Sequence, residues 1–218
     1  MAQGWFITFE GPEGGGKTSH LHALADYLRH HHVPVLVTRE PGGTPLGQRL
    51  RDLILHPSED DWVDRAEVFL FLADRAQHVA RVLRPALARG QVILCDRYAD
   101  STLAYQGYGR GLPLDVLRTM ITFATQGLTP HRTFLFDVPP EIGLRRRHAS
   151  GQIDRLDAQT LAFHRRVRQG FLELARQEPE RWIVIDATRP WDEVQRALRH
   201  YLARWFGLPE AGDTERKG

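Results

Sequence analysis

Lysine is almost absent from this chain of 218 residues, which has 29 basic side chains but only two lysines, Lys17 and Lys217. The other 27 are arginines, so the one lysine far from the C-terminus stands out. The formal net charge is only +2, which argues against the broad basic surface of a protein that wraps a nucleic-acid polymer.

Cysteine is equally rare, because Cys95 is the only one, which excludes an internal disulfide and is typical of a reducing compartment. No run approaches the roughly 20 apolar residues of a membrane helix, and the N-terminus lacks the pattern of a signal peptide. We therefore expect a cytoplasmic globular protein with no membrane partner.

Five short apolar runs predict strands, and each is nearly continuous, as in a parallel sheet covered on both faces. They are residues 5–9, 33–38, 91–95, 133–138 and 182–186. Helical spacing is found at 17–32, 45–56, 63–89, 114–126, 139–149, 157–178 and 191–205. This alternation predicts an α/β fold with ligands at the carboxyl ends of the strands.

Residues 1–207 are expected to form one domain, since no repeat or low-complexity linker divides them. The densely charged residues 145–157 are interpreted as a flap between two helices, and the polar residues 208–218 as a frayed tail. The histidines at 30–32 are consecutive and point in different directions, so we do not expect a metal site there.

The segment GPEGGGKT satisfies the pattern G-x-x-x-x-G-K-[ST] between a predicted strand and a predicted helix. Backbone N–H groups of such a loop converge on phosphates, Lys17 reaches the β- and γ-phosphates, and the Thr18 hydroxyl coordinates Mg²⁺. All eight residues are therefore predicted to bind ATP: Gly11, Pro12, Glu13, Gly14, Gly15, Gly16, Lys17 and Thr18.

An acid followed by an arginine ends the third predicted strand, at Asp96 and Arg97. The Asp96 carboxylate suits the metal or its waters, and the Arg97 guanidinium suits an acceptor phosphate, although a structural ion pair is an alternative. The chain has no Asn-Lys-x-Asp guanine reader, and this strand does not end in paired acids. A small-molecule kinase is therefore favoured over a GTPase or an ATPase motor.

Six segments of the chain resemble the thymidylate kinase family, of the bacterial kind, over roughly residues 5–205. They are FEGPEGGGKT, TREPGGTPLG, FLFLADRAQH, DRYADSTLAYQGYGRG, DVPPE and GQIDRLD. The resemblance implies a three-layer P-loop nucleoside-monophosphate-kinase fold with a five-stranded parallel sheet. It also implies transfer of the ATP γ-phosphoryl group to dTMP, giving dTDP, with Mg²⁺ as cofactor and a homodimer as the assembly.

Phe71 and Arg75 are one helical turn apart and share a face, so a ring and a guanidinium can stack a pyrimidine and donate to its carbonyl edge. The family's matching pair does this for thymine; a core phenylalanine beside a surface arginine is the alternative. We expect the apolar stripe of the helix to face the core through Ala66, Phe69, Leu70, Ala73, Ala80 and Leu87.

The resemblance also assigns the rest of the acceptor site. Arg97 holds the dTMP phosphate with help from Arg39, and Glu13 faces the 3′-hydroxyl of the sugar. The nucleoside pocket is lined by Ser101, Thr102, Tyr105 and Gln106, with Tyr105 crowding the place of a ribose 2′-hydroxyl. Ordinary capping of a helix N-terminus is the alternative for these four.

Two further positions stay open in the sequence. The Glu40–Pro41 peptide bond is a candidate cis bond. Glu10 is either an indirect metal group or a salt-bridge partner.

The phosphate loop itself has glycine where some members of the family carry an arginine, at Gly14 and Gly15. The missing positive charge is then expected from the flap, where Arg146 and Arg155 align with the family's arginines. Such an arginine closes on the γ-phosphate and limits hydrolysis. Arg145 and Arg147 are expected to be solvated charges.

Rival functions remain: a deoxynucleoside kinase, another deoxynucleoside-monophosphate kinase, or a nucleotide-binding module without transfer. No obvious general base is present, which favours a phosphate acceptor over a hydroxyl acceptor, because the phosphate is already an anion.

Overall fold

The computed structural model describes residues 4–56, 62–149, 151 and 154–209. A five-stranded parallel sheet forms its centre, in the order β2-β3-β1-β4-β5. The strands are β1 (Trp5–Glu10), β2 (Val35–Arg39), β3 (Val92–Asp96), β4 (Arg132–Asp137) and β5 (Trp182–Asp186). The predicted sheet and strands are confirmed, with ends shifted by one or two residues.

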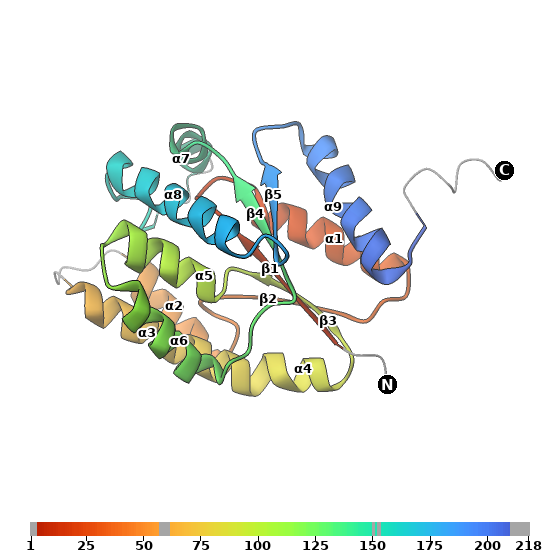
Figure 1. The fold of residues 1–218 in the computed structure, drawn as a ribbon, viewed down its shortest axis with the longest axis horizontal. Helices are drawn as coiled ribbons and strands as arrows, with labels where there is room; N and C mark the ends of the chain where they lie inside the picture. Colours follow the sequence, from red (N-terminus) through yellow and green to blue (C-terminus); the bar gives the residue numbers. More distant parts are fainter. Residues whose placement is uncertain (1–3, 57–61, 150, 152–153, 210–218) are drawn as a thin grey trace.

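Helices cover the sheet on both faces, and Figure 1 shows α1 and α9 together on one side. The helical elements, two of them π-helical, are α1 (Lys17–His30), α2 (Pro45–Leu55), α3 (Asp64–His78), η1 (Val79–Leu83), α4 (Arg84–Ala88), α5 (Ala99–Thr102), η2 (Leu103–Gly109), α6 (Leu114–Thr125), α7 (Pro140–Ala149), α8 (Leu161–Gln177) and α9 (Trp191–Phe206). This is the predicted three-layer α/β architecture.

Two large apolar clusters hold the layers together. One packs Phe9 and Phe136 of the sheet against Leu24 of α1 and Leu198 of α9. The other joins α3, η2, α6 and α8 over the opposite face and includes Phe171. Each buried side chain in both clusters is at most 9 % exposed, so the hydrophobic effect stabilises all three layers at once.

The helix predicted over 63–89 changes its hydrogen bonding in the middle, where a π-helical turn separates α3 from α4. Pro85, which has no backbone N–H, stands at the start of α4 and accounts for part of the change. The helix predicted from residue 157 begins instead at Leu161, because Thr160 caps it by accepting from the Phe163 N–H at 3.2 Å.

The prediction that the apolar stripe running through α3, η1 and α4 faces the core was wrong. Its members at 66, 69, 73 and 80 are exposed, and the side chain of Phe69 is 61 % exposed. The buried face instead carries Glu67, Asp74, Arg75 and His78 beside apolar neighbours. Partners from other elements bind each of these side chains, although one oxygen of Asp74 has none, so hydrophobic periodicity alone could not identify the inward face.

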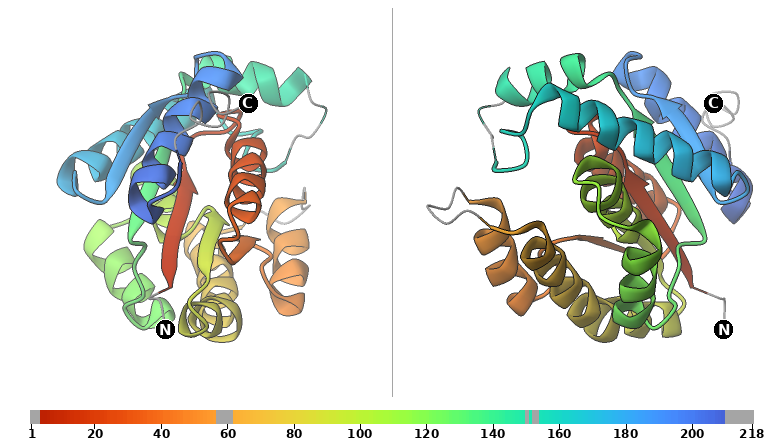
Figure 2. Two further views of the ribbon diagram at one scale, coloured as in Figure 1. Left: turned by 90° about the vertical axis from the view of Figure 1, so that its right-hand side faces the viewer. Right: turned by 60° about the vertical axis from the view of Figure 1, so that its left-hand side comes forward.

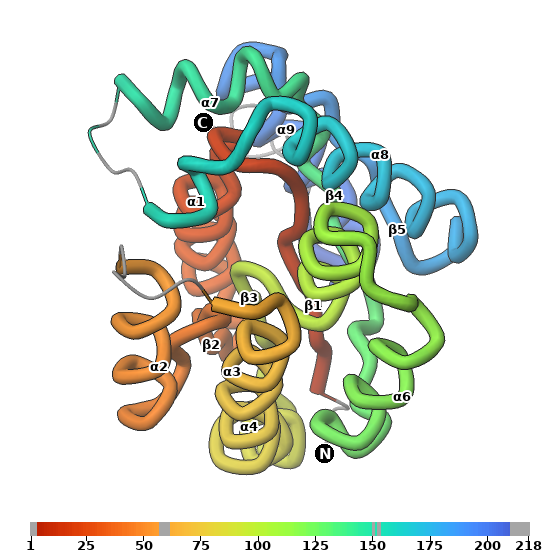
Figure 3. The backbone as a smooth tube through the Cα atoms, turned by 90° about the vertical axis from the view of Figure 1, so that its left-hand side faces the viewer, coloured from red at the N-terminus to blue at the C-terminus, as the bar shows by residue number. Residues whose placement is uncertain are grey.

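The carboxyl ends of the strands meet where α7 approaches the N-terminal end of α1, as Figures 2 and 3 show. Within the described part of the chain, no helix is both long and apolar enough to cross a membrane.

Candidate active site

The phosphate loop lies between β1 and α1. Gly16 caps the helix with a left-handed backbone, φ 80°, and no side chain that the structure describes caps the first N–H groups of α1, which leaves them available to an anion. Lys17 donates from Nζ to the carbonyl oxygens of Gly11 at 3.0 Å and Pro12 at 2.7 Å. Burial lowers the pKa of Lys17 to about 8, and the neighbouring charge of Arg97 acts in the same direction.

Helix α7 packs onto this loop backbone against backbone. A Cβ atom on Gly14 would lie 2.0 Å from the carbonyl oxygen of Gly143, and one on Gly143 would lie 2.1 Å from that of Glu13. Arg146 of the same helix donates to the carbonyls of Gly14 at 3.3 Å and Ala187 at 2.9 Å. The helix therefore carries the Arg146 guanidinium to the edge of the phosphate loop.

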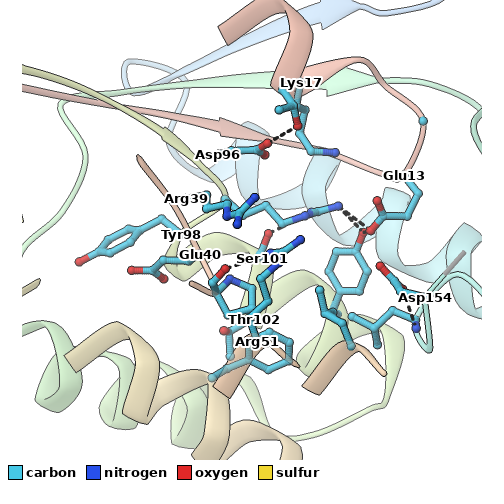
Figure 4. A pocket seen from close by; sticks show the side chains of 18 of the residues that line it. Glu13, Lys17, Arg39, Glu40, Arg51, Asp96, Tyr98, Ser101, Thr102 and Asp154 are labelled. Carbon is cyan, nitrogen blue, oxygen red and sulfur yellow. Dashed lines mark hydrogen bonds and ion pairs between the residues drawn. The ribbon is translucent and has the colours of Figure 1, made fainter. Parts of the chain in front are cut away.

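Thr18 and Asp96 meet at the end of β3, where the Thr18 hydroxyl donates to Oδ2 of Asp96. Lys17 lies next to Thr18, so a hydroxyl, a carboxylate and an ammonium group share this corner of the site. Figure 4 shows Lys17 and Asp96 together here.

Arg97 follows in a left-handed backbone conformation, φ 66°, which is uncommon for a residue with a side chain. Its guanidinium donates to Glu13 at 2.6 Å, to the Tyr105 hydroxyl at 3.0 Å, and to the Gly11 carbonyl and Ser101 hydroxyl at 3.1 Å. It also lies 5.0 Å from the centre of the Tyr105 ring. These contacts hold one side chain between the phosphate loop and η2.

Glu13 stays ionised beside that guanidinium. Burial alone would raise the pKa of Glu13, but the charges of Arg97 and Lys17 outweigh it and lower the pKa to about 2. Tyr105 adds a hydrogen bond of 2.8 Å from its hydroxyl to the same carboxylate oxygen. The phosphate loop therefore presents a fixed negative charge toward Arg97 and Tyr105.

Glu10 lies beneath this cluster and is fully buried. It accepts from the backbone N–H of Tyr98 at 2.7 Å and from the Ser101 hydroxyl at 2.6 Å. Burial, reinforced by the charge of Asp100, raises the pKa of Glu10 to about 8. These bonds anchor the start of α5, directly after Arg97.

A cavity of about 530 Å³ connects these groups with α2, α3 and η2. In Figure 4, Arg51 and Thr102 lie on the side of this cavity away from Lys17. Fifteen of the predicted site residues line it: Glu13, Gly14, Gly16, Lys17, Thr18, Arg39, Phe71, Arg75, Asp96, Arg97, Ser101, Thr102, Tyr105, Gln106 and Arg146. Gly11, Pro12, Gly15 and Arg155 belong to the predicted set but do not line it.

Arg75 is 2 % exposed, and polar contacts fix its guanidinium in the wall of the cavity. It donates from Nε to Glu40 at 2.7 Å, from Nη1 to the Thr102 hydroxyl at 2.9 Å, and from Nη2 to the Tyr98 carbonyl at 3.0 Å. Glu40 precedes Pro41 through a cis peptide bond, the candidate named from the sequence.

Glu40 is itself held by a second partner, His78, whose Nδ1 lies 2.8 Å from Glu40 Oε1. The other ring nitrogen of His78 lies 2.7 Å from the Thr38 hydroxyl. Asp74 joins the same turn by accepting from the Gly42 N–H at 3.1 Å, while its Oδ2 is buried without a partner. This network fixes the turn between β2 and α2.

The two flap arginines occupy different places. Arg146 lines the cavity, whereas Arg155 donates to Glu67 and to the Ile54 carbonyl and lies 5.0 Å from the centre of the Trp62 ring. Arg155 therefore faces α2 and α3 rather than the phosphate loop in this structure.

Arg147, expected to be a solvated charge, instead lines the cavity and pairs with Asp154 at 3.2 Å and Asp157 at 3.0 Å. Sequence reasoning also missed Arg51 of α2, which lines the cavity and donates to the Pro41 carbonyl at 2.9 Å. The only signal for Arg51 was its place on the helix that follows the TREPGGT turn.

The loop, the acid and arginine at the end of β3, and the adjoining cavity define a P-loop nucleotide kinase with a second ligand compartment. The family model for thymidylate kinase matches residues 9–198. The chain therefore belongs to the thymidylate kinase family, and the resemblance stated from the sequence is confirmed.

Individual relatives agree over nearly the whole chain. The thymidylate kinase of Deinococcus radiodurans is 53 % identical over 212 residues, which cover 97 % of this chain and all of the relative. That of Desulfovibrio desulfuricans is 52 % identical over 211 residues, covering 91 % and 97 %. The crystal structure of thymidylate kinase from Ehrlichia chaffeensis superposes with a TM-score of 0.75 at 32 % identity, covering 92 % of this chain and 99 % of that one.

The buried carboxyl of Asp74 predicts a measurable pH dependence. Burial, with the nearby charge of Glu40, raises the pKa of Asp74 from 3.8 to about 6, so the folded state binds the proton more tightly than the unfolded state. Wild-type stability should then fall as pH rises across that interval. As pH rises from about 4 to about 7, the free energy of unfolding of Asp74→Asn should rise by up to about 3 kcal/mol relative to that of wild type. Urea unfolding at each pH measures this difference.

Asp115→Asn provides the control, because it makes the same change in an exposed side chain. A stability difference for Asp74→Asn that is constant over the same pH range would contradict the raised pKa.

Proposed function

We propose that this chain transfers the γ-phosphoryl group of ATP to dTMP, giving dTDP and ADP, in the cytoplasm and within one domain of residues 1–207. Membership of the thymidylate kinase family supports this reaction. The observation that carries it is the position of Arg97, which joins the phosphate loop to a second ligand compartment. A kinase of two nucleotides needs a cation at that junction.

On the donor side, the N–H groups at the start of α1 and the ammonium group of Lys17 bind the ATP phosphates. Lys17 donates to two loop carbonyls in the structure, so phosphate oxygens would replace these acceptors. The exchange keeps the buried ammonium group hydrogen-bonded throughout.

The donor set at the end of β3 fits Mg²⁺. Thr18 and Asp96 offer a hydroxyl and a carboxylate oxygen, the hard ligands that Mg²⁺ prefers. Among the described residues, no three His, Cys, Asp or Glu side chains form a cage, and Mg²⁺ in kinases takes few protein ligands alongside phosphates. When bound, the ion would neutralise charge on the phosphates.

On the acceptor side, Phe71 stacks the pyrimidine and Arg75 donates to its carbonyl edge, while Arg97 and Arg39 bind the dTMP phosphate. Glu13 accepts from the 3′-hydroxyl of the sugar. The Tyr105 hydroxyl is bonded to both Arg97 and Glu13, which fixes the ring where it excludes a ribose 2′-hydroxyl.

Transfer then requires positioning and charge neutralisation rather than a covalent intermediate. An oxygen of the dTMP phosphate attacks the γ-phosphorus in line, and ADP leaves. Arg97 holds the attacking phosphate while Lys17 stabilises the charge that spreads over the γ-phosphate oxygens. No side chain has to remove a proton, because the acceptor is already an anion.

A steady-state assay with ATP and a panel of dTMP, dUMP, dCMP, dAMP, dGMP and thymidine tests the proposal. We expect dTMP to be the best acceptor and thymidine to be inactive, because Arg97 and Arg39 bind a phosphate that thymidine lacks. Turnover of thymidine alone would favour a deoxynucleoside kinase. ATP binding without ADP formation from any acceptor would favour a nucleotide-binding module.

The flap arginines supply the charge that the phosphate loop lacks. Arg146 already lies at the loop, and Arg155 would reach the γ-phosphate by leaving Glu67. We expect Arg155→Ala to lower kcat by at least about tenfold with little change in the KM for dTMP, because its charge is needed in the transition state. The measurement is steady-state kinetics of wild type and variant.

Arg145→Ala is the matched control, because Arg145 is exposed and is predicted to be a solvated charge. An unchanged kcat for Arg155→Ala would remove Arg155 from the flap role and leave that role to Arg146.

The assembly we propose is a homodimer that covers the outer faces of α3 and α6. These helices lie side by side (Figure 1), and Phe69 of α3 and Phe123 of α6 are 61 % and 88 % exposed. Val116 of α6 is also half exposed. A second copy of the chain would remove these large apolar side chains from water.

Phe123→Asp should therefore convert the dimer into a monomer, since it places a charge in an apolar interface. Light scattering during gel filtration measures the mass. Val184→Asp, an equally polar change at an exposed position of β5, is the control and should remain dimeric. A wild-type mass of one chain at micromolar concentration would contradict the dimer.

A further inference from the structure

Gln106 lies in the wall of the acceptor compartment, on η2, and is only 1 % exposed. Its amide nitrogen donates to Oε1 of Glu67 at 2.8 Å. Glu67 belongs to α3, one turn before Phe71, so the two residues share a face of that helix. A buried amide next to a ligand cavity can present either a donor or an acceptor to the ligand. The hydrogen bond that the amide makes with the protein decides which of the two it presents.

Glu67 is an ionised carboxylate that can only accept. It is 1 % exposed and also accepts a hydrogen bond from Arg155. Arg110 donates two more, from Nη2 at 3.0 Å and from Nε at 3.3 Å. Burial raises the pKa of Glu67, but the bonds from Arg110, Gln106 and Arg155 outweigh it and keep the pKa below its ordinary value. Gln106 must therefore turn its NH₂ group to Glu67, which directs the acceptor end of the amide, Oε1, away from Glu67.

The second polar side chain proposed to contact the base, Arg75, is a hydrogen-bond donor rather than an acceptor. Arg75 has only donors, and Glu40, Thr102 and the Tyr98 carbonyl fix its orientation. The compartment thus offers a donor from α3 and an acceptor from η2. A base with a carbonyl at C4 and a hydrogen on N3 matches this pair, whereas a base with an amino group at C4 and a bare N3 opposes both.

We propose that Glu67 is a positioning residue that sets the hydrogen-bond polarity of the base compartment, by holding the amide of Gln106 so that only its oxygen meets the base. It thereby selects 4-oxo pyrimidines over 4-amino pyrimidines. The inference rests on the proposed function, in which this compartment holds the base of the acceptor nucleotide. Glu67 does not touch the substrate and acts through Gln106.

The test is the ratio of kcat/KM for dTMP to that for dCMP in Glu67→Gln. A glutamine at 67 has both a donor and an acceptor, so the amide of Gln106 is free to rotate, and the ratio should fall at least about tenfold. The ratio of dTMP to dUMP should stay within about twofold, because these bases share the same C4 and N3 edge. Loss of the Arg155 contact affects all acceptors alike and cancels in both ratios.

Arg110→Met is the matched control. It removes the bonds from Arg110 to Glu67 but leaves the carboxylate that holds Gln106, so both ratios should match wild type. If Glu67→Gln lowers kcat/KM equally for dTMP and dCMP, Glu67 has a structural role only and the proposal is wrong.

A measurement on the wild-type enzyme covers the case in which Glu67→Gln does not fold. dTMP methylated at N3 has no hydrogen for Gln106 Oε1, and we expect its kcat/KM to be about a hundredfold below that of dTMP. Equal turnover of the two would overturn the assigned polarity. If no nucleoside monophosphate is turned over at all, the proposed function fails rather than the role of Glu67.

Discussion

The ion pair between Arg97 and Glu13 is the contact on which both ligand compartments depend. Glu13 belongs to the loop after β1 and Arg97 to the turn after β3, so the pair ties the ends of two neighbouring strands. The left-handed backbone of Arg97 carries strain that persists because four acceptors and the Tyr105 ring fix its side chain. The strain lies at the junction of the phosphate loop and the adjoining cavity.

Helix α3 shows how a polar interior builds the second compartment. Four of its buried side chains are Glu67, Asp74, Arg75 and His78, and each lies on the face toward the site rather than toward solvent. Ionic groups in such positions are costly unless they are paired and hydrogen-bonded, and here Glu40, Gln106 and Arg110 provide partners. Helix α3 therefore makes fewer apolar contacts on this face, and its buried polar side chains form a rigid set of donors and acceptors beside the cavity.

The sequence was sufficient for the sheet and for the phosphate loop, because continuous apolar strands and the glycine spacing are local signals. Most of the other residues around the cavity came from the family resemblance. The sequence patterns failed where long-range polar partners decide the outcome. The apolar stripe through Phe69 was placed inward because periodicity does not register buried salt bridges. Arg147 was expected to be a solvated charge because it lies in a charged segment. It pairs instead with Asp157, which no spacing rule connects to it. The start of α8 at Leu161 depends on a cap by Thr160 that the helical periodicity concealed.

The close approach of Gly14 and Gly143 has a consequence for how this enzyme family can vary. Because a Cβ atom at position 14 would lie only 2.0 Å from the facing carbonyl oxygen, no side chain fits there while α7 keeps its present position. An arginine at this point of the loop and this packing of α7 thus exclude each other sterically. A chain with an arginine at position 14 would therefore also need a different position of α7. The residue at position 14 and the packing of α7 at Gly143 can change only together.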